Sequence, residues 1–202
     1  MVLYNVDVTR NPHVGVLALQ GDFEAHGRRL RELGAEVTFV RKPEQLDSLD
    51  ALIIPGGEST TFLNFLEERG FLDRLRDFVR AKPTFGTCAG AILLAKEVSN
   101  PPQPSLAALD IDIRRNAYGR QINSFIGSTE SALGPIEMVF IRAPRVERTG
   151  PQVEVLARHG GDPVLVRQGH IMAATFHPEL SEQSTVHAEF LKLVRNGGPK
   201  QK

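Results

Sequence analysis

Short apolar runs mark the strands expected in the first half of the chain. Val14–Leu19 and Ala51–Ile54 are nearly continuous in apolar residues, which is typical of strands buried on both faces of a parallel sheet. Glu36–Val40 and the shorter Pro83–Phe85 are predicted as two further strands. We therefore expect a mainly parallel sheet to begin near residue 14.

Helical spacing separates these runs. Residues 22–33 place their apolar side chains on one face of a helix, which Gly34 would end. Three more helices and a short helical turn are predicted at residues 60–68, 72–80, 91–95 and 46–49. Strands that alternate with helices across short connections indicate an α/β fold around a mainly parallel sheet.

The second half of the chain is richer in strands. We predict strands at residues 111–114, 139–142, 153–158, 163–168 and 171–175. Polar turns separate them, so we expect an antiparallel extension of the same sheet, followed by a helix at Thr185–Arg195. Because no linker divides the chain, we expect one domain over residues 1–202, with an N-terminal extension at 1–12 and a flexible tail at 197–202.

Composition narrows the class of protein. The 24 Lys and Arg residues balance 24 Asp and Glu residues, so charge gives no reason to expect a nucleic-acid or membrane-surface partner. No apolar run approaches the roughly 20 residues that span a bilayer, and no secretory leader pattern opens the chain. The single cysteine excludes an internal disulfide and a multi-cysteine zinc site. We expect a cytoplasmic protein.

That single cysteine, Cys88, lies in Gly86-Thr-Cys-Ala-Gly90, between a predicted strand and a predicted helix. A lone cysteine is more often a buried core residue. Glycines two positions before and after it, however, predict a nucleophile elbow, where side chains would clash in the tight turn. A thiol at the start of a helix is favoured as the reactive thiolate.

A thiol nucleophile needs a base and a group that orients the base. Of six histidines, His177 stands out because Pro178 and Glu179 follow it. Proline favours an extended conformation for His177, and positions two apart then point the same way, which places Glu179 beside the imidazole. We interpret the other five histidines (13, 26, 159, 170 and 187) as structural or exposed.

Acyl transfer also needs donors for a developing oxyanion. The backbone N–H of Ala89 follows the nucleophile directly, and Gly57 in Pro55-Gly-Gly-Glu-Ser59 is a second candidate from a neighbouring strand end. Arg115, in a polar segment at 115–121, is suited to a substrate carboxylate. From chemistry alone, a solvated surface role for this arginine is equally good.

Together, the cysteine elbow, His177-Pro-Glu179 and the glycine pair at 56–57 resemble the class I glutamine amidotransferases. More narrowly, the chain is similar to the glutaminase subunit of pyridoxal 5′-phosphate synthase over about residues 14–194. The segments that carry this similarity are Leu19-Gln-Gly-Asp22, Pro55-Gly-Gly-Glu-Ser-Thr60, Arg115-Asn-Ala-Tyr-Gly-Arg-Gln121 with Ser124-Phe125, and Phe140-Ile-Arg-Ala-Pro144.

The resemblance implies a three-layer, flavodoxin-like sandwich and hydrolysis of glutamine to glutamate and ammonia. It implies that Cys88 is the nucleophile, His177 the base and then the acid, and Glu179 the orienting carboxylate. It further implies a synthase subunit that receives the ammonia and raises the activity, and no metal or organic cofactor. The implied glutamine-binding residues are Gly56, Gly57, Glu58, Arg115, Ile141 and Arg142, with Gly57 and Ala89 as oxyanion donors.

Three departures from the family pattern affect loops. The chain has extra residues before its first strand, Ile126 replaces an expected acidic residue, and the Asn100-Pro-Pro-Gln103 loop has no clear counterpart. Two alternatives stay open. One is another elbow-cysteine hydrolase on a similar sheet, such as a protease-like or dienelactone-hydrolase-like enzyme, which a substrate panel would reveal. The other is a non-catalytic interaction subunit, which would be expected to have lost part of the triad.

Overall fold

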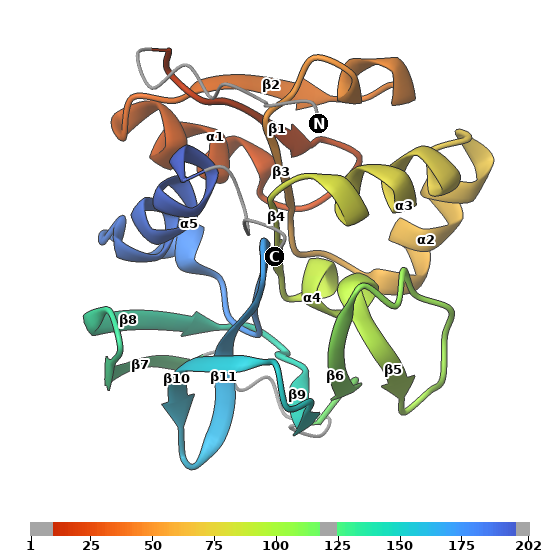
Figure 1. Cartoon of the computed structure of the whole chain (residues 1–202). Helices are drawn as coiled ribbons and strands as arrows, with labels where there is room; N and C mark the ends of the chain where they lie inside the picture. The colour runs from red at the N-terminus through yellow and green to blue at the C-terminus, as the bar shows by residue number, and fades with distance from the viewer. Residues whose placement is uncertain (1–9, 118–124, 197–202) are drawn as a thin grey trace.

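The computed structural model describes residues 10–117 and 125–196. Its centre is a seven-stranded sheet in the order β10-β11-β12-β4-β3-β1-β2 (Figure 1). Neighbours from β12 to β2 pair in parallel, whereas β11 pairs antiparallel with both β10 and β12. The strands are His13–Leu17 (β1), Glu36–Val40 (β2), Ala51–Ile54 (β3), Thr84–Thr87 (β4), Glu154–His159 (β10), Asp162–Gln168 (β11) and Ile171–Ala174 (β12). The predicted mixed, mainly parallel sheet is confirmed.

Helices cover both faces of this sheet. Alternate strand residues point to opposite sides, so Ile53 packs in the same buried cluster as Leu30 and Phe190, whereas Leu52 packs with Leu75. The first cluster lies under α1 and α5, and the second under α2, α3 and α4. The helices are Phe23–Glu32 (α1), Ser59–Glu68 (α2), Leu72–Ala81 (α3), Ala89–Leu94 (α4) and Thr185–Arg195 (α5).

The expectation that every later strand extends the main sheet is wrong for two of them. The strand predicted at 111–114 is β6 (Leu109–Arg114), which belongs to a separate sheet with β5 (Ala95–Ser99) and β9 (Arg145–Thr149). The strand predicted at 139–142 is β8 (Gly134–Phe140), which pairs with β7 (Phe125–Ser131). Strands β6 and β8 bury alternate residues, as is typical of strands with one buried face and one face toward solvent.

Smaller differences concern element bounds. The short turn predicted at 46–49 is a 3₁₀ helix, η1, at Pro43–Leu46, where proline occupies the first helical position. Helix α4 begins directly after Cys88, two residues earlier than predicted, and Ala95 already belongs to β5. Within the described residues, no helix combines the length and apolar character needed to cross a membrane.

Candidate active site

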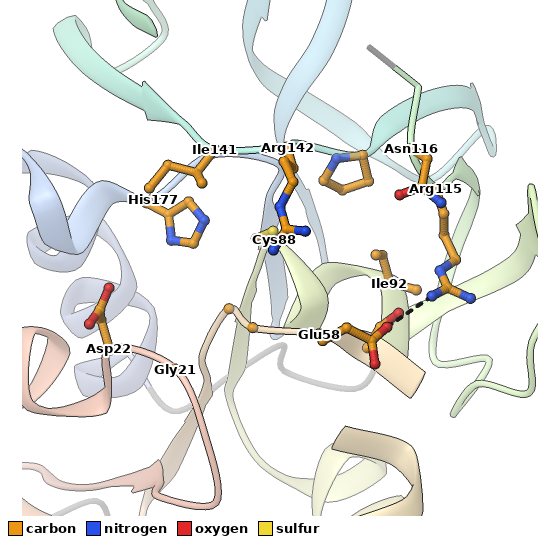
Figure 2. A pocket seen from close by; sticks show the side chains of 14 residues that line it. Gly21, Asp22, Glu58, Cys88, Ile92, Arg115, Asn116, Ile141, Arg142 and His177 are labelled. Carbon is orange, nitrogen blue, oxygen red and sulfur yellow. Dashed lines mark hydrogen bonds and ion pairs between the residues drawn. The ribbon is translucent and has the colours of Figure 1, made fainter. Parts of the chain in front are cut away.

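Cys88 stands between β4 and α4 in a backbone conformation that is unusual for any residue except glycine (Figure 2). Its φ is 47° and its ψ is −102°, which marks a sharp, strained turn. A Cβ on Gly86 would lie 2.6 Å from the Gly90 carbonyl carbon, and a Cβ on Gly90 would lie 2.0 Å from the Ile54 oxygen. The predicted steric need for both glycines is therefore confirmed.

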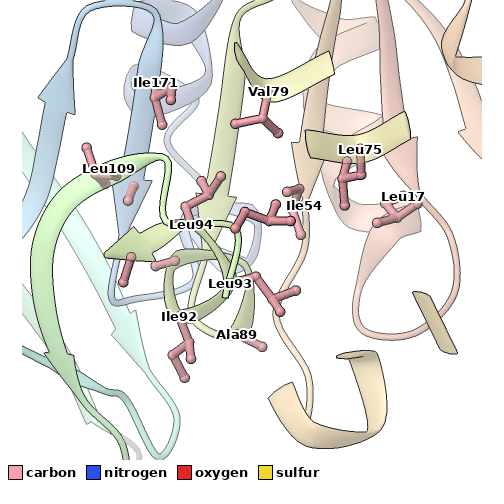
Figure 3. Close-up of a cluster of buried hydrophobic side chains, with 14 of the residues drawn as sticks. Leu17, Ile54, Leu75, Val79, Ala89, Ile92, Leu93, Leu94, Leu109 and Ile171 are labelled. Carbon is pink, nitrogen blue, oxygen red and sulfur yellow. The ribbon is translucent and has the colours of Figure 1, made fainter. Parts of the chain in front are cut away.

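The core fixes this turn from behind. The side chains of Leu93 and Leu94 are fully buried and pack in one cluster with Ile54 and Val79 (Figure 3). At the other end of the turn, the Cys88 backbone N–H donates to the Ala174 oxygen of β12 over 2.9 Å. Because α4 and β12 both hold Cys88, its backbone has a defined position although the residue is in a turn.

His177 follows β12 and is held from a different strand. Its backbone N–H donates to the Val139 oxygen of β8 over 2.8 Å. Its ring Nδ1 lies 2.7 Å from Oε1 of Glu179, as the sequence predicts. The backbone conformation expected for this pairing was wrong, because Pro178–Leu180 forms a 3₁₀ turn, η2, instead of extended chain. The turn brings the carboxylate back toward the imidazole by its own curvature.

The pKa shifts of His177 and Glu179 favour the charged forms of both side chains. Burial alone would lower the pKa of His177, but hydrogen bonding with Cys88 and the Glu179 carboxylate raises the pKa to about 10. Burial would likewise raise the pKa of Glu179, yet the His26 and His177 rings lower the pKa to about 2. An imidazolium held between a sulfur and a carboxylate is the arrangement that stabilises a thiolate.

Cys88 and His177 open onto a pocket of about 270 Å³. The volume suits a ligand of amino-acid size. All six residues predicted to bind glutamine line it, namely Gly56, Gly57, Glu58, Arg115, Ile141 and Arg142. Of these, Arg142 has a φ of 46°, so the segment after β8 turns sharply at the pocket wall. Ala89 is fully buried and follows Cys88 as the first residue of α4.

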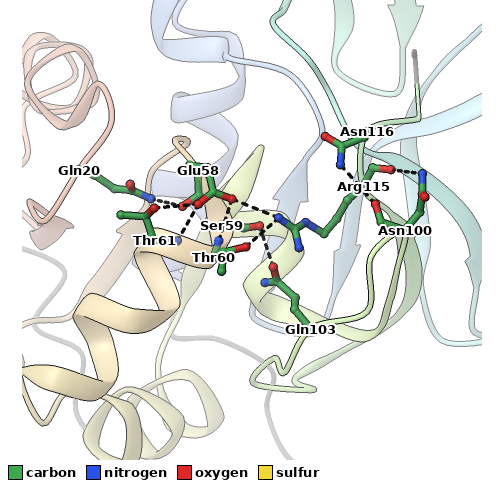
Figure 4. Close-up of polar contacts among 9 residues, drawn as sticks. All are labelled: Gln20, Glu58, Ser59, Thr60, Thr61, Asn100, Gln103, Arg115 and Asn116. Atoms are coloured by element: carbon green, nitrogen blue, oxygen red, sulfur yellow. Dashed lines mark hydrogen bonds and ion pairs between the residues drawn. The ribbon is translucent and has the colours of Figure 1, made fainter. Parts of the chain in front are cut away.

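Glu58 and Arg115 bridge two walls of the pocket (Figure 4). The Glu58 carboxylate accepts hydrogen bonds from the Thr60 and Thr61 backbone N–H groups and so caps α2. Partial burial opposes the effect, but these bonds lower the pKa of Glu58 to about 2. Arg115 Nη2 donates to Glu58 Oε1 over 3.1 Å and to Thr60 Oγ1 over 2.9 Å. The arginine is thus held at the pocket instead of extending into solvent.

The glycine pair after β3 packs closely against the site. A Cβ on Gly56 would lie 2.5 Å from Cε1 of His177. Gly57 has a φ of 132°, and a Cβ there would lie 2.8 Å from the Gln20 side chain. Gln20 in turn donates from Nε2 to the backbone carbonyl oxygen of Glu58 over 2.8 Å. Position 56 therefore requires glycine because of its close contact with His177, and position 57 requires it because of its positive φ as well.

Sequence reasoning missed His26 at this site. Its ring is fully buried, and its Nε2 lies 3.3 Å from Oε2 of Glu179. No local motif separates His26 from the other histidines interpreted as structural or exposed. Residues 118–121 and Ser124, from the polar segment singled out in the sequence, lie outside the described residues. Among the described residues, no group of three His, Cys, Asp or Glu side chains is placed to hold a metal ion.

Comparisons with known proteins show the family of the chain. Residues 16–196 match the SNO glutamine amidotransferase family. The chain is 61% identical over 191 residues to the pyridoxal 5′-phosphate synthase subunit PdxT of Koribacter versatilis, covering 94% of this chain and 99% of the relative. It is 51% identical to the subunit of the same name from Solibacter usitatus, covering 90% of this chain and 98% of that relative. A solved glutamine amidotransferase superposes with a TM-score of 0.85 at 52% identity, covering 90% of this chain and 98% of that structure.

Proposed function

The chain belongs to the SNO glutamine amidotransferase family, and from this premise we propose that it hydrolyses L-glutamine to L-glutamate and ammonia through a thioester on Cys88. One observation carries the proposal. The elbow sulfur and the His177–Glu179 pair meet at a pocket whose wall includes every residue predicted to bind glutamine. Another elbow-cysteine hydrolase, one of the two alternatives left open by the sequence, would not need the triad and the predicted glutamine-binding residues in one pocket.

The first half of the reaction forms the acyl-enzyme. His177 takes the proton of the Cys88 thiol, and the resulting thiolate attacks the side-chain amide carbon of glutamine. The negative charge that develops on the amide oxygen is stabilised by the backbone N–H groups of Gly57 and Ala89. His177 then returns its proton to the departing nitrogen. The carbon–nitrogen bond breaks, and ammonia leaves a thioester on Cys88.

The second half releases glutamate. His177, again neutral, takes a proton from a water molecule as that water attacks the thioester carbon. The carbon–sulfur bond breaks, and the Cys88 sulfur regains a proton from His177. Glu179 accepts from Nδ1 of His177 throughout, so that Nε2 is the nitrogen that exchanges protons. Each step uses side chains and backbone N–H groups of this chain, and the proposal requires no metal or organic cofactor.

Arg115, Glu58 and the 141–142 segment would hold the amino-acid end of glutamine. An arginine is suited to a carboxylate, and Arg115 already lies at the pocket in contact with Glu58. The Glu58 carboxylate, ionised because of its helix-capping bonds, offers a partner for the substrate ammonium group. The amide end would then point toward Cys88.

The relatives are subunits of pyridoxal 5′-phosphate synthase, and we assign this chain the same place. The ammonia would pass directly to a synthase subunit for pyridoxal 5′-phosphate (vitamin B6) synthesis. Sheltered transfer matters because ammonia that reaches neutral water becomes ammonium, which is a poor nucleophile. We further propose that the chain acts as one glutaminase domain in the cytoplasm.

The test is glutamate release from glutamine, measured with and without a synthase subunit, for the natural chain and for Cys88→Ala. We expect release that the partner stimulates and that the variant abolishes. Release that persists in Cys88→Ala would overturn the thioester mechanism. No release by a folded protein with a competent partner would favour another elbow-cysteine hydrolase, and a panel of ester and amide substrates would then identify it.

A further inference from the structure

The carboxylate of Glu179 is fully buried, and its two oxygens have different surroundings. Oε1 is the partner of His177 Nδ1. Oε2 has no hydrogen bond within the described structure, although Nε2 of His26 lies only 3.3 Å away. A buried carboxylate oxygen without a donor is costly. An N–H on Nε2 of His26 would lie close to this oxygen and also 3.2 Å from the Thr87 hydroxyl, with which Nε2 makes its hydrogen-bond contact.

His26 is the first link of a buried chain of two imidazoles. Its Nδ1 lies 3.0 Å from Nε2 of His187 on α5, and its Nε2 lies 3.2 Å from the hydroxyl of Thr87. Both histidines are fully buried. Burial lowers the pKa of His26 and lowers the pKa of His187 to about 3, so both rings are neutral at neutral pH.

Neutral rings leave one arrangement of protons that fits the carboxylate. Glu179 carries no proton, so a bare Nε2 on His26 would set a lone pair against a negative oxygen. His26 therefore keeps its proton on Nε2 and accepts at Nδ1 from the Nε2–H of His187. In this arrangement Nδ1 of His187 carries no proton, and it has no hydrogen-bond partner in the described structure.

Helix α1 holds the 3₁₀ turn of the active site at two points. His26 reaches Glu179, and Arg29, one turn later on the same face, donates from Nη2 to the Ser181 oxygen. Glu179 lies in this 3₁₀ turn, and Ser181 directly follows it. Helix α1 thus fixes the depth and rotation of the carboxylate that His177 relies on.

We propose that His26 is a positioning residue for the reaction, whose Nε2–H supports the second oxygen of Glu179 and so keeps this carboxylate ionised and directed at His177. The kinetic part of the inference rests on the proposed glutaminase activity, but the effect on the thiol does not. The charged or titratable groups that face the His26 and His187 rings are Glu179, His177, Asp22 and Arg29.

The test compares two amides at position 26. The amide of His26→Gln reaches the place of Nε2 and keeps a donor for Glu179, whereas the shorter amide of His26→Asn stays near the place of Nδ1. Because Cys88 is the only cysteine in the sequence, the rate of alkylation by iodoacetamide against pH reports on its thiolate alone. This readout needs neither glutamine nor a synthase subunit.

We expect His26→Asn to shift the midpoint of the alkylation profile upward by about one pH unit, because a less stabilised Glu179 supports the His177 imidazolium less well. His26→Gln should stay near the natural profile. In glutamine hydrolysis, His26→Asn should lower kcat about 10-fold with little change in KM, because His26 does not line the described pocket.

His170→Asn is the matched control. Its Nε2 pairs with the Val79 oxygen on α3, away from Glu179, so the alkylation profile should not move. An unshifted profile for folded His26→Asn, or equal shifts for His26→Asn and His26→Gln, would overturn the inference. A shift in alkylation without any glutamine hydrolysis by the natural chain would support the positioning role and reject the proposed function alone.

Discussion

His177 donates from Nδ1 to Oε1 of Glu179 over 2.7 Å, although Pro178 alone separates the two residues. The 3₁₀ turn that starts at the proline makes this contact. These two residues therefore form one compact unit, in which the proposed base lies against its proposed orienting carboxylate.

Glu179→Gln should preserve the shape of the unit and remove its charge. The imidazolium of His177 then loses its anionic partner, and an amide nitrogen facing Nδ1 would favour the wrong tautomer. We expect kcat to fall by about 10²–10⁴-fold, in line with loss of the orienting carboxylate in other triads. Steady-state glutamine hydrolysis measures the fall in kcat, and Glu182→Gln, at an exposed position, is the control. Activity near the natural level would mean that Glu179 does not orient the base.

Gly56→Ala should misplace the imidazole. The new Cβ would lie 2.5 Å from Cε1 of His177, so the ring or the loop must move. Displacements of about 1 Å at a reacting group cost roughly 10²-fold in rate, and we expect kcat to fall on that scale. Gly34→Ala is the control for a methyl group in open space, because a Cβ there meets nothing within 4 Å, although the φ of 82° makes the alanine strained. That variant should lose stability and keep its activity.

Arg115→Lys should weaken glutamine binding more than it slows the chemistry. Arg115 contacts Glu58 and Thr60 through Nη2 alone, which leaves its other guanidinium nitrogens for a substrate carboxylate. A lysine keeps the charge, but its single ammonium group would have to serve both sets of partners. We expect KM for glutamine to rise about 10-fold, equivalent to about 1.4 kcal/mol, with kcat nearly unchanged. Arg114→Lys, on the exposed side of β6, should leave both constants alone. A fall in kcat without a rise in KM would contradict the substrate-binding role.

Acid should destabilise the fold before carboxylates are protonated. Above pH 6.5, His187 is neutral in both the folded and unfolded chain. As pH falls from 6.5 toward 3, the unfolded chain binds a proton that the folded chain, with its pKa of about 3, does not. Unfolding therefore becomes progressively easier over that range. The lowered pKa of His26 acts in the same direction.

Urea unfolding between pH 7 and 5 measures this loss. Glu179, whose pKa is lowered from 4.5 to about 2, contributes its own loss of stability only below about pH 4.5. His177, whose pKa is raised to about 10, acts with the opposite sign, because its contribution to stability grows as pH falls toward 6.5 and changes little below that. The loss of stability between about pH 6 and 5 therefore belongs to His26 and His187. His187→Leu should flatten the dependence there, because the neutral side chain has no proton to bind. An equally steep dependence in that variant would contradict the assignment.

The sequence by itself determined the chemistry and the main scaffold. Continuous apolar runs predict buried parallel strands, and the glycines at 86 and 90 predict an elbow. Both predictions succeed because these features depend on local sterics. The pairing of His177 with Glu179 was predictable from their spacing of two residues, whereas the 3₁₀ turn that makes the contact was not. The family motifs in the sequence also contain six residues of the pocket wall.

Only the tertiary structure decided which distant segments meet. Strands β6 and β8 were expected in the main sheet, but half-buried strands can pair in several ways, and their partners β9 and β7 are set by packing. His26 joins the site only because the order of parallel strands brings α1 against the turn after β12. No local pattern marks a histidine whose partner lies 153 residues away, since burial and contact between remote segments are properties of the folded core.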